Sequence, residues 1–163
     1  MKKTFLIPFF ALLAIVSIAQ PKRLSIPEVF KLAECTSNSC MFKYAREKGF
    51  VSDDSQLPGS DQYQYNKNRP DMSSGKADKL IIGIQKFWNS VLFRTYDPNV
   101  EVEFRQLIVA GELKETGSRK AVLGGTEKSF TSKSYPEYSA TLVIKNEAGV
   151  NYYEIMVMRF IKN

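Results

Sequence analysis

The sequence predicts an α+β fold in which two helix-plus-three-strand units form one antiparallel sheet with the helices on one face. Three observations predict it. Residues 25–49 and 98–117 show the apolar spacing of amphipathic helices. Strand-like segments follow each helical region, and short turn sequences connect them as hairpins. Hairpin-linked strands are antiparallel, and such a sheet commonly carries its helices on a single face.

The chain begins with the features of a secretory signal peptide. Residues 1–3 form a short basic start, and residues 5–18 form an apolar stretch of about 14 residues, shorter than the ~20 that span a bilayer as a helix. Ser17 and Ala19 then supply small residues at the positions that signal peptidase reads. We therefore expect removal of residues 1–19 and export to the periplasm or the cell exterior.

The predicted mature chain, residues 20–163, is long enough for one domain with its own core. Cleavage removes Lys2 and Lys3, so the formal net charge falls from +6 to +4. This mild charge and the lack of any dense Lys/Arg cluster argue against nucleic-acid binding. No later segment is apolar enough to predict a transmembrane helix after cleavage.

The sequence contains no histidine, and this excludes several chemistries. Ser-His-Asp and Cys-His nucleophile systems cannot be built. Histidine zinc sites are impossible, and two cysteines are too few for an all-cysteine site within one chain. We expect no metal and no cofactor, and the sequence favours a protein that is not an enzyme.

Cys35 and Cys40 are the two cysteines, and an even count in an exported protein favours a disulfide. Residues 36–39 between them are Thr-Ser-Asn-Ser, a helix-breaking stretch that can form a loop and bring the two sulfurs together. The alternative is a pair of buried free thiols. Redox catalysis would more usually show a two-residue gap between the cysteines.

Two short helices are predicted over residues 25–49. Ser25 stands three residues before Glu28, which is the spacing of a capping box. Asn38 or Ser39 can cap the second helix. Gly49 is expected to end it in a left-handed conformation, with the following phenylalanine closing back onto the last helical turn.

The strands of the first unit are less regular. Residues 62–65 alternate in polarity, and residues 79–88 are rich in strand-forming side chains. Asn89 and Ser90 are expected to form a tight hairpin turn that leads into a strand over residues 91–96.

The second unit begins at Asp97 and Pro98, which predict a helix start, and Gly117 is expected to end that helix. The halves, about 25–97 and 98–161, follow the same order of elements. Strand-like segments follow the second helix at residues 119–123, before a Gly124-Gly125 break, and at 127–133, 138–144 and, after a turn at 146–149, 151–161.

Four short segments follow one another along this plan: Lys48-Gly49-Phe50 at the end of the helical hairpin, Tyr63 with Tyr65 on a strand, Phe93-Arg94-Thr95-Tyr96 before the second helix, and Tyr152-Tyr153-Glu154-Ile155 in the closing strand pair. With them the chain resembles small exported bacterial proteins of uncharacterised function. The order of elements is also similar to the tandem helix-plus-sheet repeats of the beta-lactamase inhibitor protein family. The resemblance implies that architecture. The second half departs from it, because Ser118 and not an aromatic residue follows Gly117.

Aromatic residues on or beside the predicted strands are the candidate binding residues. Strands favour aromatic side chains for packing, so a core or cross-strand role is the alternative for each. Tyr152 and Tyr153 are adjacent, so they must face opposite sides of a strand. The candidates are Tyr63, Tyr65, Trp88, Tyr96, Tyr138, Tyr152 and Tyr153.

The sequence thus favours a non-enzymatic binding or inhibitor-like module that acts on an unidentified protein or glycan in the cell envelope. A small hydrolase that uses carboxylates on cell-wall or glycan material is one alternative. An envelope structural protein is another. Two convergent carboxylates in a deep pocket would favour the hydrolase.

Overall fold

The computed structural model describes residues 23–53, 62–68, 76–84, 88–122 and 124–160. The predicted signal peptide, residues 1–19, lies outside this part of the chain. The elements in chain order are α1 (Ile26–Ala33), α2 (Asn38–Glu47), β1 (Val51–Ser52), β2 (Gln62–Asn68), β3 (Ala77–Ile84), β4 (Trp88–Thr95), α3 (Asn99–Val109), β5 (Leu113–Lys120), β6 (Thr126–Ser132), β7 (Tyr138–Glu147) and β8 (Val150–Phe160).

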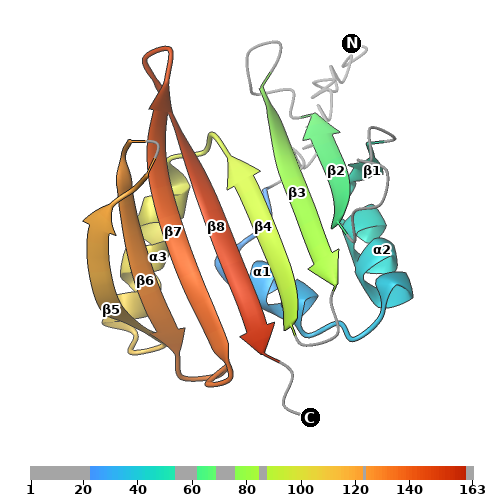
Figure 1. The fold of residues 1–163 in the computed structure, drawn as a ribbon, viewed down its shortest axis with the longest axis horizontal. Helices are drawn as coiled ribbons and strands as arrows, with labels where there is room; N and C mark the ends of the chain where they lie inside the picture. The colour runs from blue at the N-terminus through green and yellow to red at the C-terminus, as the bar shows by residue number, and fades with distance from the viewer. Residues whose placement is uncertain (1–22, 54–61, 69–75, 85–87, 123, 161–163) are drawn as a thin grey trace, which may run out of the picture.

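The strands form one eight-stranded sheet in the order β1-β2-β3-β4-β8-β7-β6-β5, and every neighbouring pair is antiparallel. The helices lie behind the sheet in Figure 1, with α1 behind the centre and α3 behind the β5–β8 half. The predicted α+β class and antiparallel sheet are therefore confirmed. In the described residues, no helix is both long enough and apolar enough to cross a bilayer.

The predicted count of three strands after each helix is not observed. Each half supplies four strands, β1–β4 and β5–β8, and the two groups meet where β4 pairs with β8. Most of β5 in the second half occupies sequence that we expected to be helical. The helix ends at Val109 and not at Gly117, because Gly111 adopts a left-handed conformation with φ +72°. The strand predicted at 119–123 accordingly begins earlier, at Leu113.

The predicted turn at Asn89-Ser90 is also wrong. Both residues lie inside β4, which starts at Trp88, while β3 ends at Ile84. Ile84 pairs with Asn89, so the connection falls on residues 85–87, outside the described part of the chain. Asn89 is buried, and its side-chain amide donates to the Cys35 carbonyl at 3.1 Å, which uses this polar residue to hold β4 to the α1–α2 connection.

The core lies between the helices and one face of the sheet. The apolar side of α1 is fully buried, and it contacts the central strands β4 and β8. The largest fully buried core side chains are Phe50, Phe93, Leu24, Ile26, Leu32, Met41, Leu80, Ile82, Ile155, Val29, Val91 and Val100.

Local capping sets the helix ends much as the sequence predicted. The Ser25 and Glu28 capping box is present, with the Ser25 amide donating to Glu28 Oε2 at 2.8 Å. Gly49 has φ +82°, and the amide that follows it donates back to the Ala45 carbonyl at 3.0 Å. The cap of α2 is Ser37 and not the expected Asn38 or Ser39, and the Ser37 Oγ accepts from the Cys40 amide.

Charged side chains connect α1 to α3 across the two halves. Glu103 Oε1, on α3, accepts from the Ile26 amide at 2.8 Å, one of the free amides at the start of α1. Its other oxygen pairs with Arg23 Nη2 at 2.7 Å, and Arg23 Nε also reaches Asp97 Oδ2 at 3.3 Å. The two helices are therefore held by a shared carboxylate as well as by apolar packing.

Cys35 and Cys40 form the predicted disulfide, with their Cα atoms 5.6 Å apart. The bond closes the short connection between α1 and α2.

We expect removal of this disulfide to lower the free energy of unfolding by about 2 kcal/mol, because closing a small loop removes limited entropy from the unfolded chain. Urea unfolding with and without dithiothreitol measures this effect. A Cys35→Ala/Cys40→Ala variant is the control and should not respond to the reductant. Complete unfolding on reduction, or no change at all, would contradict the prediction.

Candidate binding face

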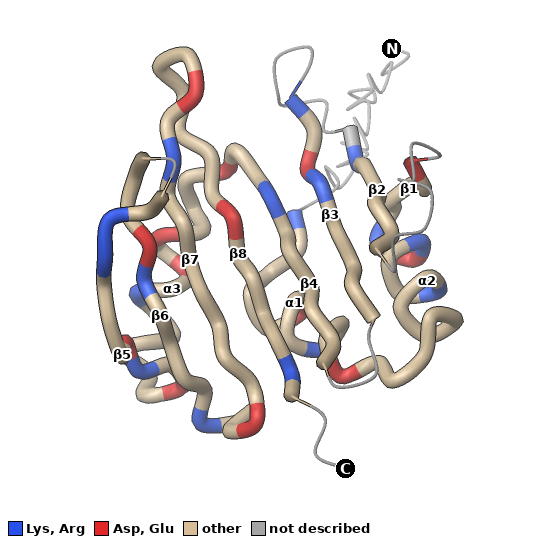
Figure 2. Tube along the Cα trace, in the orientation of Figure 1, with Lys and Arg blue, Asp and Glu red and all other residues tan. Residues whose placement is uncertain are grey.

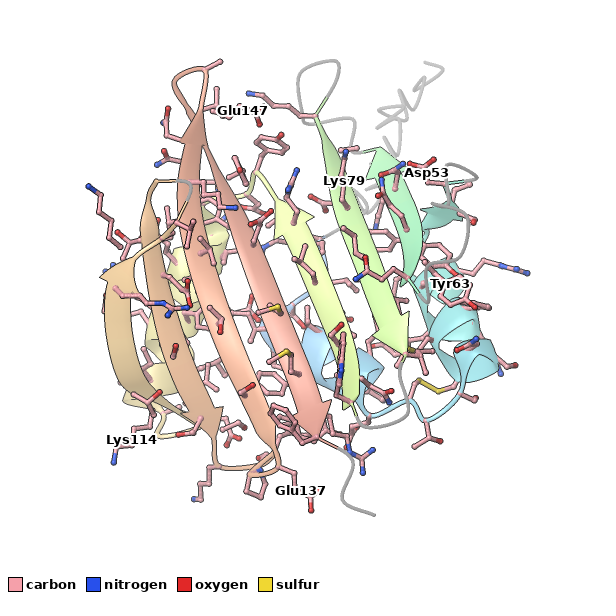
Figure 3. All side chains as sticks on the ribbon, viewed as in Figure 1. Asp53, Tyr63, Lys79, Lys114, Glu137 and Glu147 are labelled. Atoms are coloured by element: carbon pink, nitrogen blue, oxygen red, sulfur yellow. A yellow bond between two sulfur atoms is a disulfide. The ribbon has the colours of Figure 1, made fainter. Side chains whose placement is uncertain are left out.

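The sheet face opposite the helices carries no other element among the described residues, and we call it the open face. It faces the viewer in Figures 1 and 3, with the helices behind the sheet. Because side chains alternate along a strand, the residues between the core positions of each strand belong to it. Cross-strand pairing then arranges these residues in rows that run across the sheet.

The central row of the open face is apolar. Ile81 on β3 pairs with Leu92 on β4, and Leu92 pairs with Met156 on β8. We call these three residues the apolar row. All three are partly exposed, although their neighbours along each strand are buried in the core. Three adjacent strands therefore present aliphatic and thioether surface to solvent.

Aromatic residues lie at one end of the open face. Trp88 pairs with Phe160, which is 57% exposed. Gly83 lies beneath the indole: a Cβ placed there would stand 3.5 Å from Trp88 Cζ3 and 2.8 Å from Ser90 Oγ. The glycine thus lets the tryptophan side chain lie close to the sheet.

A charged cluster lies at the opposite end, where Lys79 on β3 pairs with Arg94 on β4 and Arg94 pairs with Glu154 on β8. Arg94 Nε donates to Glu154 Oε1 at 2.9 Å, and Lys145 Nζ donates to Glu154 Oε2 at 2.7 Å. Figure 2 shows the basic positions of β3 and β4 beside the acidic position of β8. We call Lys79, Arg94, Lys145, Glu154 and Tyr152 the cationic cluster.

Two cations of this cluster, Arg94 and Lys145, lie over the ring of Tyr152. The Arg94 guanidinium lies 4.9 Å from the Tyr152 ring centroid, and Lys145 Nζ lies 5.8 Å from it. The Tyr96 ring lies 6.0 Å from the Tyr152 ring, and Lys76 Nζ lies 5.5 Å from the Tyr96 centroid. The two neighbouring tyrosine rings thus lie close to three basic side chains, Lys76, Arg94 and Lys145.

Glu154 is the buried anion of the cluster. Burial alone raises the pKa of its carboxyl, but the hydrogen bonds from Lys145 and Arg94 outweigh burial, and the pKa lies below its ordinary value. Glu154 is therefore ionised at neutral pH and holds both cations in fixed positions.

The seven candidate aromatic residues divide between the two faces. Trp88, Tyr96 and Tyr152 lie on the open face. The other four side chains are on the helix side of the sheet, where they take part in packing. They are Tyr63 and Tyr65 beside Phe42, Tyr138 beside Phe30 and Tyr135, and buried Tyr153. The expectation that Tyr152 and Tyr153 point to opposite sides is confirmed.

The helix-side tyrosines have environments that suit packing. Burial raises the pKa of Tyr65, Tyr138 and Tyr153, and Glu101 further raises that of Tyr153 through a hydrogen bond. Tyr63 accepts from the Asn38 side-chain amide at 3.1 Å. Tyr63 and Tyr65 also line a hollow of about 430 Å³ beside α2 and β1, whose described lining residues include no carboxylate.

The apolar row and most of the cationic cluster were not among the sequence candidates. One signal was available: β8 reads Ile155-Met156-Val157-Met158, which is apolar on both faces and not on alternate residues. When one face of such a strand is buried in the core, apolar side chains also lie on its other face. In the described residues, no three His, Cys, Asp or Glu side chains gather to hold a metal ion.

Comparison with protein-family models, curated proteins and solved structures finds no match to this chain. The resemblance to the beta-lactamase inhibitor protein family therefore stays a prediction.

We expect Glu154→Gln to lower the free energy of unfolding at neutral pH by about 1–3 kcal/mol, because two cations lose their shared carboxylate. Since the folded-state pKa of Glu154 lies below the ordinary 4.5, its contribution is present above that pH and is lost as the pH falls through the folded value. Urea unfolding at several pH values should show the two proteins converging in acid.

Glu115→Gln is the matched control, because Glu115 pairs with Lys128 at 3.4 Å with both side chains more than a third exposed. Its effect should stay below about 1 kcal/mol. An equal effect of the two substitutions, or a constant difference across all pH values, would contradict the assigned role of Glu154.

Proposed function

We propose that this protein is an exported, non-enzymatic binding module that binds a protein partner on its open face. The observation that carries the proposal is the combination on that face of a partly exposed apolar row with an aromatic and cationic cluster. Protein-binding surfaces favour Met, Arg and aromatic side chains at their centres, and the open face presents all three.

The strands of the open face are held in place by the core, which suits a binding surface. Each strand that contributes to the apolar row has its other face in the core, so little ordering is needed when a partner binds. The extended aliphatic surface of Ile81, Leu92 and Met156 is better matched to protein side chains than to a sugar, whose rings stack on flat aromatic faces.

Export is the second part of the proposal. It rests on the signal-peptide features of residues 1–19 and on the Cys35–Cys40 disulfide, since disulfides persist in oxidising compartments. The proposed site of action is the periplasm or the cell exterior.

The carboxylate hydrolase has less support. Glu101 and Glu115 line the same hollow between α3 and the sheet, but its volume is about 150 Å³, below the range usual for ligand pockets. Each carboxylate also has a partner, Tyr153 for Glu101 and Lys128 for Glu115.

We expect Leu92→Asp to reduce capture of the partner from envelope extract at least about tenfold, because a charge at the centre of an apolar interface is left without a partner. Immobilised wild-type and variant proteins, compared by quantitative mass spectrometry of what they retain, measure this.

Val109→Asp is the matched control, since Val109 is 84% exposed on α3, on the helix side of the sheet. This variant should capture the partner as the wild type does. Thermal unfolding followed by circular dichroism checks that both variants are folded. Equal capture by Leu92→Asp and wild type, or loss of capture with Val109→Asp alone, would contradict the proposal.

A further inference from the structure

The cationic cluster has more positive than negative charge on the open face. Lys79, Arg94 and Lys145 surround one carboxylate, Glu154, which accepts hydrogen bonds from Arg94 and Lys145. Lys79 makes no ion pair with any residue in the described part of the chain. Its positive charge is therefore available to a group that arrives from outside.

Lys79 also lies directly opposite Arg94, on the same face of neighbouring strands. Two like charges in this position repel each other. Glu154 reduces the repulsion only from the Arg94 side, because its two oxygens are taken by Arg94 and Lys145. A second carboxylate above the β3–β4 pair would reduce the excess positive charge and gain charge-assisted hydrogen bonds.

The basic groups are held in position before anything binds. The Arg94 guanidinium is fixed between Glu154 and the Tyr152 ring, and Lys145 is fixed by the same two residues. A bound carboxylate therefore loses little affinity to the ordering of flexible side chains.

The apolar row begins next to this charge. Ile81 and Leu92 each lie two residues along the strand from Lys79 and Arg94, on the same face. Two residues of a strand span about 7 Å, which is the separation of alternate side chains in an extended peptide. The face is thus arranged to receive an acidic side chain and an apolar side chain that neighbour each other on one partner.

We propose that the cationic cluster is the anchor for a carboxylate of an acidic protein segment whose apolar side chains lie on the apolar row. This inference rests on the proposed binding function and names the chemistry of the partner. The excess positive charge of the cluster is complementary to an acidic segment. The adjoining apolar row can bind apolar side chains of that segment, which a small anion does not have.

A random 12-residue peptide library displayed on phage, selected on the immobilised protein, provides the probe. The selected peptides should be enriched in Asp or Glu next to apolar residues. A synthetic copy of a selected peptide should bind about tenfold more tightly than its Asn/Gln counterpart, as measured by fluorescence anisotropy, and added salt should reduce that difference.

Lys79→Glu is the decisive variant, because it places the chain's own carboxylate opposite Arg94. This substitution should weaken binding of the acidic peptide to the protein about tenfold. Lys114→Glu is the matched control: Lys114 lies on the open face at the opposite end of the sheet (Figure 3), and its substitution should change the affinity less than about twofold. Circular dichroism confirms that both variants are folded.

Several outcomes would overturn the inference. They are selection of no peptides, selection of peptides without acidic residues, equal weakening by Lys79→Glu and Lys114→Glu, and binding of the protein to anionic phospholipid vesicles in place of peptides. A dimer that Leu92→Asp dissociates would instead show that a second copy occupies the face.

Capture from envelope extract separates this failure from failure of the proposed function. If Leu92→Asp prevents capture and Lys79→Glu does not, the open face binds a partner but the acidic anchor is wrong. If neither variant affects capture, both proposals fail.

Discussion

The packing of α1 against β4 and β8 is the contact on which the rest of the structure depends. The apolar side of α1 is fully buried against β4 and β8, the two strands that join the halves of the sheet. Because side chains alternate along a strand, this contact commits Phe93 and Ile155 to the core and leaves Leu92 and Met156 on the other face. The chemistry of the open face is therefore a consequence of where the helices pack.

The same constraint explains why the open face can act as a preorganised surface. Its strands are fixed from behind by the core, and its charged end is fixed from within, since Glu154 holds Arg94 and Lys145 while both cations contact Tyr152. Glu154 is 7% exposed although it lies on the uncovered side of the sheet. The charged side chains around Glu154 shield it from solvent, as the helices shield the core residues on the other face.

The sequence predicted features that depend on neighbouring residues: the Ser25 capping box, the left-handed Gly49 and the disulfide. It failed at Gly111, which fits the helical apolar period although it ends the helix. Alternation placed Tyr152 and Tyr153 on opposite sides, but which side faces solvent depends on packing with distant residues. The cationic cluster also needs the register between the β3–β4 pair and the β7–β8 pair, which are far apart in the chain, and local pattern does not contain that register.

No element of the described part of the chain covers the face opposite α1, and we expect a bound partner to cover it. Methionine methyl groups test it most directly, because Met156 and Met158 lie on the open face whereas Met41 is fully buried. With ε-methyl-labelled protein, a soluble nitroxide should broaden the NMR signals of Met156 and Met158 but not that of Met41, and the captured partner should protect the first two. Equal protection of all three in the free protein would contradict the account.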